Sequence, residues 1–162
     1  MTDIKPLKTK DDALRVVEFF FSDKVFEHEW APGEKEMLEK AVHGSLTDGE
    51  NHQYWFIEEG DKIIGAAGIN ENIYKSGGFE MSEDYFAVGS DCRGKGVGSL
   101  LLQRIEDFVK GKNGRYIVIE TCDTPFYEPA CRFYEDHGYK KVGTIPDYYN
   151  IGEGKIEYYK GL

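Results

Sequence analysis

One stretch of the chain, Val88 to Leu102, constrains the fold more than any other, because a short apolar strand runs into a glycine-rich loop and then an amphipathic helix. The loop holds glycines at three alternate positions, Gly94, Gly96 and Gly98. Glycine lacks a Cβ atom, so successive backbone N–H groups can converge on one anion. The unpaired N–H groups and positive dipole end of the following helix strengthen that attraction. The stretch therefore predicts an α/β domain with a phosphate-binding loop.

Two known types of phosphate loop share only part of this pattern. A dinucleotide-binding loop requires G-x-G-x-x-G, but counting from Gly94 the position of the third glycine holds Ser99. A nucleotide triphosphatase loop requires G-x-x-x-x-G-K-[ST], and Gly89, Gly94 and Lys95 satisfy most of it. Gly96 stands where the magnesium-binding hydroxyl belongs. A magnesium-dependent nucleotide-binding protein is therefore one alternative hypothesis, and a tight turn without a ligand is another.

The composition indicates a single folded domain over residues 1–162. Hydrophobic residues make up 40% of the 162 residues and aromatic residues 14%, which is enough to build a core. Lys and Arg number 20 against 30 for Asp and Glu, so the formal net charge is -10. Such a surface repels phosphate backbones and anionic lipids, so we expect neither nucleic-acid nor membrane partners. It favours cationic, amine-bearing partners.

The cysteines and the start of the chain favour the cytoplasm. Cys92, Cys122 and Cys131 are three in number and lack C-x-x-C spacing, which excludes a closed disulfide framework or a thiolate-rich zinc site. The segment Met1 to Asp12 has no apolar signal region, and the chain has no run of 18 apolar residues. The four histidines show no metal-ligand spacing, so we expect no metal and assign none of them to catalysis.

The hydrophobic periodicity predicts a mixed-sheet α/β domain. The predicted helices are Thr9 to Phe21, Pro32 to Gly44, a third carrying Leu101 to Val109 before Gly111, and a fourth carrying Ala130 to His137 before Gly138. The predicted strands are Ile4 to Leu7, Tyr54 to Ile57, Lys62 to Ile69, Tyr85 to Val88, Tyr116 to Ile119, Tyr139 to Thr144 and Lys155 to Lys160. The unbroken apolar run Tyr116 to Ile119 predicts a central, parallel strand. Gly77 and Gly78 are expected to form a loop.

Two motifs resemble those of the GCN5-related N-acetyltransferase (GNAT) family. Residues 93–98, Arg-Gly-Lys-Gly-Val-Gly, resemble its R/Q-x-x-G-x-G/A loop, which grips the pyrophosphate of acetyl coenzyme A. Residues 130–139 resemble its A-x-x-x-Y-x-x-x-G-F/Y helix. The resemblance extends to the element order and covers essentially the whole chain. It implies a mixed, mostly antiparallel sheet of about seven strands flanked by about four helices. It also implies acetyl transfer from acetyl coenzyme A to a primary amine.

The resemblance implies a role for each motif residue. The pyrophosphate would lie on Arg93 to Ser99, and the pantetheine arm would pair with Phe86 to Val88, a strand N–H of which would hold the oxyanion. Relatives frequently carry Asn where this chain has Tyr127, so a side-chain contact from this position to the arm is in doubt. The implied coenzyme-binding residues are Phe86, Ala87, Val88, Arg93, Gly94, Lys95, Gly96, Val97, Gly98, Ser99, Tyr127, Ala130 and Tyr134.

Tyr134 and Glu120 are the candidate catalytic residues. Tyr134 aligns with the family tyrosine that protonates the departing thiolate, although its helical stripe would also be buried in any amphipathic helix. Glu120 ends the apolar run before it, where strand termini in open α/β sheets face the ligand crevice, and is the first candidate for the base. An equally weighted alternative is that Glu120 only orders the strand end. Glu83, Asp84 and a water chain are the other candidate bases.

The acceptor amine stays open between polyamines, amino sugars, basic peptides and peptide N-termini. Tyrosines at 148, 149, 158 and 159 lie on the last two strands, which border the acceptor mouth in the family, and a Tyr-Tyr pair before a glycine turn resembles relatives that acetylate protein N-termini. An edge strand near the C-terminus is compatible with a monomer or a homodimer. A non-catalytic acyl-coenzyme A sensor is a further alternative, distinguished by binding without turnover.

Overall fold

The protein folds around one eight-stranded sheet. Its computed structural model describes residues 3–26, 28–48 and 50–162, so the first two residues of the segment Met1 to Asp12 lie outside it. The strands are β1 (Ile4–Pro6), β2 (His52–Glu59), β3 (Lys62–Glu71), β4 (Gly78–Met81), β5 (Phe86–Val88), β6 (Tyr116–Cys122), β7 (Lys140–Asn150) and β8 (Glu153–Gly161). The α-helices in this part of the chain are α1 (Lys10–Phe21), α2 (Glu34–Gly44), α3 (Val97–Gly111) and α4 (Glu128–Asp136). Two 3-10 turns, η1 (Ser90–Cys92) and η2 (Pro125–Tyr127), precede α3 and α4.

The strand order is β1-β2-β3-β4-β6-β8-β7, and β5 pairs with β3 beside β4. Every pairing is antiparallel except that of β4 with β6, which is parallel. The expected mixed, mostly antiparallel sheet and the central parallel strand are thus confirmed, with one strand more than predicted. The added strand is β4, and the expectation of a loop at Gly78 is wrong. Gly77 makes the turn with φ 89°, whereas Gly78 enters the ladder opposite Tyr116.

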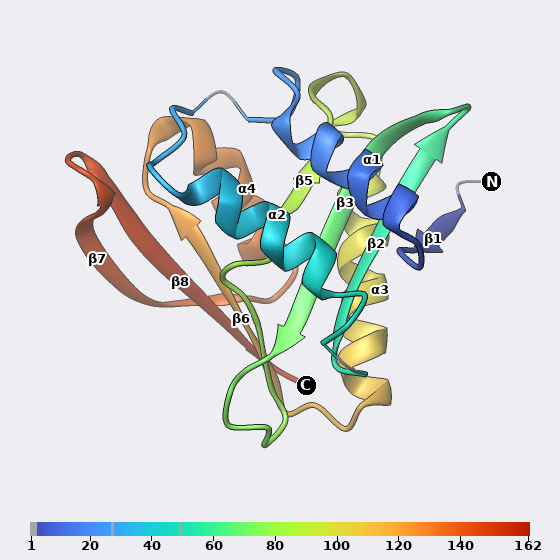
Figure 1. Ribbon diagram of the computed structural model, residues 1–162. Helices are drawn as coiled ribbons and strands as arrows, with labels where there is room; N and C mark the ends of the chain where they lie inside the picture. Colours follow the sequence, from blue (N-terminus) through green and yellow to red (C-terminus); the bar gives the residue numbers. More distant parts are fainter. Residues whose placement is uncertain (1–2, 27, 49) are drawn as a thin grey trace.

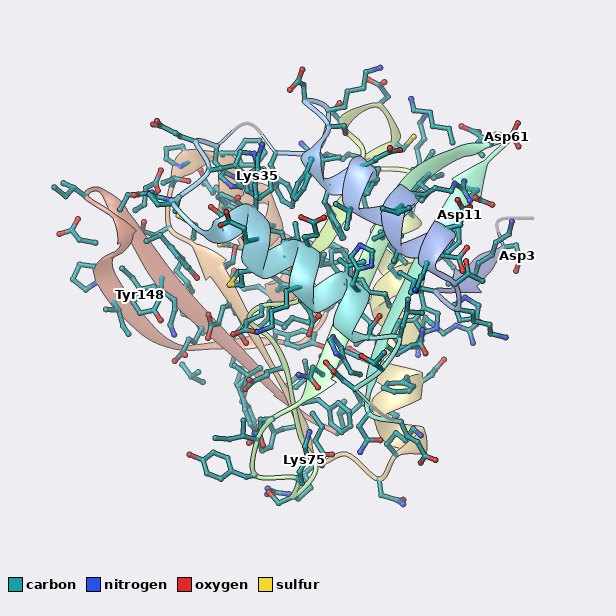
Figure 2. All side chains as sticks on the ribbon, in the orientation of Figure 1. Asp3, Asp11, Lys35, Asp61, Lys75 and Tyr148 are labelled. Carbon is teal, nitrogen blue, oxygen red and sulfur yellow. The ribbon has the colours of Figure 1, made fainter. Side chains whose placement is uncertain are left out.

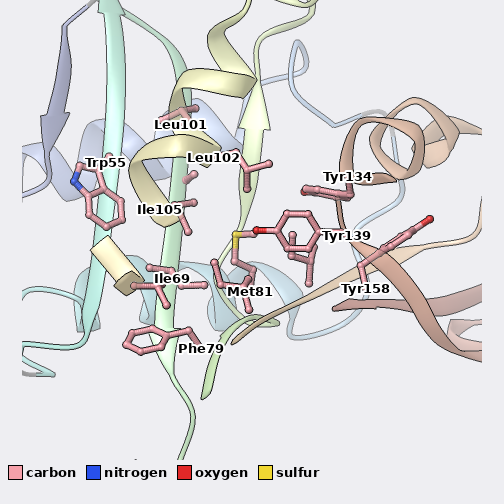
Figure 3. Close-up of a cluster of buried hydrophobic side chains, with 14 of the residues drawn as sticks. Trp55, Ile69, Phe79, Met81, Leu101, Leu102, Ile105, Tyr134, Tyr139 and Tyr158 are labelled. Carbon is pink, nitrogen blue, oxygen red and sulfur yellow. The ribbon is translucent and has the colours of Figure 1, made fainter. Parts of the chain in front are cut away.

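Helices cover both faces of the sheet, so the core has two parts. One cluster joins α3 and α4 to one face, and the other joins α1 and α2 to the opposite face. Figure 1 shows α1 and α2 in front of the sheet and α3 behind it. Figure 3 shows the first cluster, in which Leu101, Leu102 and Ile105 of α3 lie against the strands and Tyr134 comes from α4. This sandwiching leaves the sheet edges and strand ends as the places for a site.

Local sequence signals account for the helix and turn positions. Thr9 and Asp12 form the capping box expected at the start of α1, with the Asp12 N–H donating to Thr9 Oγ1 at 3.0 Å. The β2–β3 hairpin turns at Gly60, which has φ 63°. Gly65 of β3 lets α3 approach closely, because a Cβ atom there would lie 2.8 Å from Val97 Cγ1. The start of α3 is therefore fixed against the sheet.

Across residues 3–26, 28–48 and 50–162, no helix combines the length and the apolar character that a bilayer crossing requires.

Candidate active site

The sheet divides between β5 and β6, and a cleft opens there. β4 and β6 stay paired as far as Met81 and Ile119. Beyond that point β5 remains on β3, while the last residues of β6 remain on β8. In Figure 1 the two strands diverge toward the top of the view. A cleft of about 1020 Å³ is lined from β5, the start of α3, the end of β6, α4, the α1–α2 segment and the β7–β8 hairpin.

The open edge of β5 presents backbone groups to this cleft. Gly89 N–H donates to Ile64 O at 2.9 Å, and Gly68 N–H donates to Tyr85 O at 3.0 Å, so alternate residues on this stretch pair with β3. The residues between them, Phe86 and Val88, therefore direct their N–H and C=O groups away from β3 and into the opening. An extended ligand has a strand edge to pair with there.

The predicted phosphate loop lies at the mouth of the cleft with its backbone exposed. Gly94 and Gly96 have φ of 74° and 84°, and a Cβ atom at either would meet nothing within 4 Å. These two glycines are therefore required by backbone conformation rather than by space. At Gly98 the reason is space, because a Cβ atom there would lie 3.3 Å from Phe133 Cζ. Backbone conformation at Gly94 and Gly96 and close packing at Gly98 thus explain all three glycines of the loop.

The N-terminus of α3 leaves several N–H groups without a partner inside the helix. The helix begins after Gly96, whose carbonyl accepts from Leu100 N–H at 3.1 Å. The N–H groups of Val97, Gly98 and Ser99 precede that first intrahelical bond and so have no partner within the helix. No side chain in the described ranges caps this end, and its first turn carries no acidic residue. The positive end of the helix dipole thus faces the cleft.

The side chains of the loop act differently from one another. Arg93 turns back onto the protein, with Nη2 donating to Val25 O at 2.8 Å and Nε donating to Val88 O at 3.2 Å. Its guanidinium lies 5.7 Å from the centre of the Phe126 ring. Lys95 is exposed, and Ser99 Oγ lies 3.1 Å from His137 Nε2. Arg93 therefore ties the loop to the α1–α2 segment, which the sequence did not indicate.

Tyr134 extends from α4 into the cleft through a cage of rings. It is 5% exposed and packs against Phe86, Tyr139 and Tyr158, with ring centroids 6.0 to 6.1 Å apart. Burial raises the pKa of its hydroxyl above the ordinary value, so the hydroxyl stays protonated at neutral pH. The hydroxyl retains its proton at the edge of a ligand-sized cavity, as a general acid requires.

Glu120 lines the same cleft from the end of β6, where the sequence predicted it. Its Oε1 lies 3.2 Å from Lys155 Nζ, which also lies 3.1 Å from Glu157 Oε1. Burial alone would lower the pKa of Lys155, but Glu157 and Glu120 outweigh it and raise that pKa. The Lys155 ammonium lies 4.5 Å from the centre of the Tyr148 ring. Tyr148 belongs to β7 and is labelled in Figure 2. Glu120 is thus a carboxylate already paired with a cation.

The other candidate bases, Glu83 and Asp84, differ in their exposure to solvent. Glu83 is exposed beside the cleft. Asp84 is buried, and its Oδ1 lies 2.7 Å from Nε2 of the buried His52. Glu80, which the sequence did not single out, has its pKa raised by burial and by the nearby carboxylate of Glu120.

The residues at the acceptor end come from separate segments. Tyr148 and Tyr149 line the cleft, as expected for the acceptor mouth. Tyr158 is buried in the same core cluster as Tyr134, and its hydroxyl donates to Glu135 Oε1 at 2.9 Å, so the expectation that it borders the mouth is wrong. Tyr127 Oη lies 2.7 Å from His28 Nδ1, across 99 residues of sequence. No local signal in the sequence pairs these two side chains.

The amino-acid sequence is similar to those of known acetyltransferases. A family model described as the acetyltransferase (GNAT) family matches residues 16–139. The N-alpha-acetyltransferase RimI of Mycobacterium tuberculosis is 27% identical over 143 residues, which cover 88% of this chain and 82% of that protein. The "Probable N-acetyltransferase camello" of Xenopus laevis is 26% identical over 108 residues, 66% of this chain. The match spans 48% of camello, about half of its length.

Solved structures share the fold. A GNAT-family structure from Desulfovibrio desulfuricans aligns with a TM-score of 0.81 at 24% identity and covers 99% of both chains. An aminoglycoside 6'-N-acetyltransferase complexed with coenzyme A aligns with a TM-score of 0.73 at 17% identity, over 98% of this chain and 96% of that one.

Proposed function

The chain belongs to the GNAT family of acetyltransferases, and from this membership we propose that it transfers the acetyl group of acetyl coenzyme A to a primary amine. The observation that carries the proposal is the division of the sheet between β5 and β6, with an amide-rich loop at its mouth. A thioester-bearing arm needs an open strand edge, and its diphosphate needs a cluster of N–H donors. Both lie in one cleft.

The coenzyme is assigned to the residues that fit its parts. The N–H groups at the start of α3 and the preceding loop would hold the diphosphate, and no Cβ atom from Gly94 or Gly96 fills that space. The open edge of β5 would pair with the pantetheine arm. Val88 N–H would then face the thioester oxygen and stabilise the oxyanion that develops there. Tyr127 and Ala130 would border the arm from η2 and α4.

The proposed chemistry is direct attack by the amine on the thioester carbon. The amine nitrogen forms the new C–N bond, the C–S bond breaks, and its electron pair leaves on sulfur. Tyr134, whose hydroxyl is protonated at neutral pH, donates its proton to the thiolate. Glu120 attracts the ammonium form of the acceptor and helps to remove the proton that blocks its lone pair. Presenting a lysine-like amine as the free base at neutral pH costs about 4–5 kcal/mol.

The acceptor is proposed to be a cationic amine, either a small molecule or a peptide N-terminus or lysine. Carboxylates of Glu34, Glu83, Glu120 and Glu153 line the cleft, and the chain carries a formal net charge of -10. RimI of M. tuberculosis is named as an N-alpha-acetyltransferase, which supports a peptide N-terminus as one candidate.

The three cysteines are free thiols, which fits a single domain working in the reducing cytoplasm.

A thiol-release assay with acetyl coenzyme A and a panel of amines tests the proposal. The expected result is amine-dependent release of coenzyme A that requires no magnesium. Tight coenzyme binding without turnover on any amine would favour the non-catalytic sensor. Magnesium-dependent nucleotide binding without coenzyme binding would favour the nucleotide-binding alternative. In that case the loop would bind magnesium without the usual Ser or Thr hydroxyl, because Gly96 stands at that position.

A further inference from the structure

Four polar side chains from four separate segments form one hydrogen-bonded chain on the wall of the cleft. They are His28 from the α1–α2 segment, Glu34 from the start of α2, Tyr85 before β5 and Tyr127 of η2. His28 Nδ1 lies 2.7 Å from Tyr127 Oη, and His28 Nε2 lies 3.0 Å from Glu34 Oε1. Tyr85 Oη donates to the same Glu34 oxygen at 2.5 Å. The hydrogen bonds therefore run from the Tyr127 phenol in the cleft through His28 to the Glu34 carboxylate, which also accepts from Tyr85.

The donors and acceptors of this chain are fixed by Glu34. Burial alone would raise the pKa of Glu34, but hydrogen bonds from His28, Tyr85 and the Ala31 N–H outweigh it and lower that pKa. An ionised carboxylate only accepts hydrogen bonds, so His28 Nε2 carries the proton that it donates to Glu34. In the neutral imidazole Nδ1 is then the acceptor, and the Tyr127 hydroxyl donates to it. The lone pairs of Tyr127 Oη are left for a hydrogen-bond donor in the cleft.

Resting on the proposed function, we propose that Tyr127, His28 and Glu34 form a proton relay that takes the second proton from the acceptor nitrogen. An ammonium acceptor loses one proton before it attacks and another from the positively charged nitrogen of the tetrahedral intermediate. In the second step the N–H bond breaks and its proton passes to Tyr127 Oη. The phenolic proton passes to His28 Nδ1. The resulting imidazolium is balanced by the Glu34 carboxylate, and the intermediate collapses as Tyr134 protonates the sulfur.

Glu120 does not compete for this second proton on equal terms. Its carboxylate is held by Lys155, whose side chain is 9% exposed. Glu120 thus serves to attract and prepare the ammonium group, whereas His28 Nδ1 is positioned to receive the phenolic proton of Tyr127. Tyr127 is the catalytic residue of the relay, because it alone of the three would touch the acceptor.

The relay is enclosed by aromatic rings and by further polar side chains. The rings of Phe26 and Trp30 pack against the His28 ring with centroids 5.3 and 4.7 Å away, and Glu34 and Tyr127 form hydrogen bonds with it. The groups close to Tyr127 are His28, Glu34, Cys122, Tyr149 and Glu153. His28 Nδ1 is thus the atom to which the phenolic proton of Tyr127 can pass.

Kinetics of His28→Ala and Tyr127→Phe test the relay on an amine that the wild-type protein acetylates. Each change is expected to lower kcat about 100-fold, the lower range for a positioned proton acceptor. Added imidazole is expected to restore the rate of His28→Ala but not of Tyr127→Phe. Because the two residues act in one relay, the double variant is expected to lose no more than either single one. His43→Ala, a half-buried histidine at the far end of α2, is the matched control.

The tautomer of His28 gives a readout that does not depend on turnover. Nitrogen-15 spectra of the wild-type protein are expected to show a neutral His28 with its proton on Nε2. A proton on Nδ1, or an unchanged kcat in both variants of an active protein, would overturn the relay alone. A wild-type protein that transfers no acetyl group would overturn the proposed function and the relay together. If His28→Ala does not fold, Tyr127→Phe, which keeps the aromatic ring, decides.

Discussion

Tyr134 serves two purposes with one side chain, because its ring packs in the core while its hydroxyl lines the cleft. We expect Tyr134→Phe to lower kcat about 100-fold or more, since the thiolate loses its proton donor, while coenzyme affinity changes little. Steady-state kinetics and a coenzyme titration measure the two effects. Tyr139→Phe is the control, because its hydroxyl donates to Glu106 at 3.1 Å inside the core. Equal loss of kcat in both variants would remove Tyr134 as the acid.

Gly96 gives a second prediction at the scale of single residues. Its φ of 84° is costly for other residues, by about 1–2 kcal/mol. We expect Gly96→Val to move the loop amides and to raise the Kd for acetyl coenzyme A at least about tenfold. Gly152→Val carries a similar strain, with φ 83°, in the β7–β8 turn and controls for strain elsewhere. Isothermal titration in which both variants bind like the wild type would contradict the loop assignment.

The sequence indicated individual residues only where a motif or a strand end marked them. Tyr134 and Glu120 are the candidates found on those grounds, and both line the cleft. Arg93 is among the implied coenzyme-binding residues, and its side chain donates to the Val25 and Val88 carbonyls, which the motif did not indicate. His28 had no such mark, because its partner Tyr127 is 99 residues away. Contacts at that separation are set by the fold and not by local pattern.

At the scale of elements, the packing of α3 on β3 depends on a glycine. A Cβ atom at Gly65 would lie 2.8 Å from Val97 Cγ1 and 3.1 Å from Leu101 Cδ1. We expect Gly65→Ala to lower the free energy of unfolding by about 1–3 kcal/mol, because the helix is forced away from the strand. Gly143→Ala in β7, where the nearest atom would be 3.5 Å away, is the control. Equal unfolding midpoints in urea for the two variants would contradict this account.

A buried histidine joins β2 to the segment between β4 and β5. His52 Nε2 lies 2.7 Å from Asp84 Oδ1, and Nδ1 lies 3.1 Å from Asp48 Oδ2. Burial alone would lower the pKa of His52, but the two carboxylates outweigh it and raise that pKa. The charged form is therefore favoured in the folded state. The resulting stability is fully present below the unfolded imidazole pKa of about 6.5 and is lost as the pH rises through the raised pKa of the folded state.

This linkage predicts that the free energy of unfolding decreases from mildly acidic to alkaline pH, and that His52→Gln flattens the decrease. Urea unfolding across that pH range measures it. His43→Gln provides the matched comparison, since that side chain is only half-buried. A wild-type profile that rises over the same range, or one that His52→Gln leaves unaltered, would show that the two carboxylates do not hold a charged imidazole.

Element prediction succeeded where periodicity was long and failed where it was short. The four predicted helices and the predicted strands β2 and β3 are present. β4 was missed because it has four residues and begins at a glycine. β7 and β8 extend through much of the predicted connection at 145–154, because an exposed hairpin needs little apolar patterning to pair. Short strands are defined by their neighbours in the sheet.

At the scale of the whole molecule, the division between β5 and β6 unites the sequence motifs into one site. Two helical layers pack on the sheet, with α1 and α2 on one face and α3 and α4 on the other. This opening is lined by the predicted phosphate loop, by Tyr134 and by Glu120. The sequence indicated the fold class and both motifs. It did not indicate how far the strands separate, because that depends on packing across the entire chain.

A crystal structure with bound acetyl coenzyme A tests this account most directly. We predict that the diphosphate lies on the N–H groups of residues 94–99, that the pantetheine arm pairs with the open edge of β5, and that the sulfur lies beside the Tyr134 hydroxyl. Coenzyme bound outside the opening between β5 and β6, or a diphosphate held away from the start of α3, would contradict it.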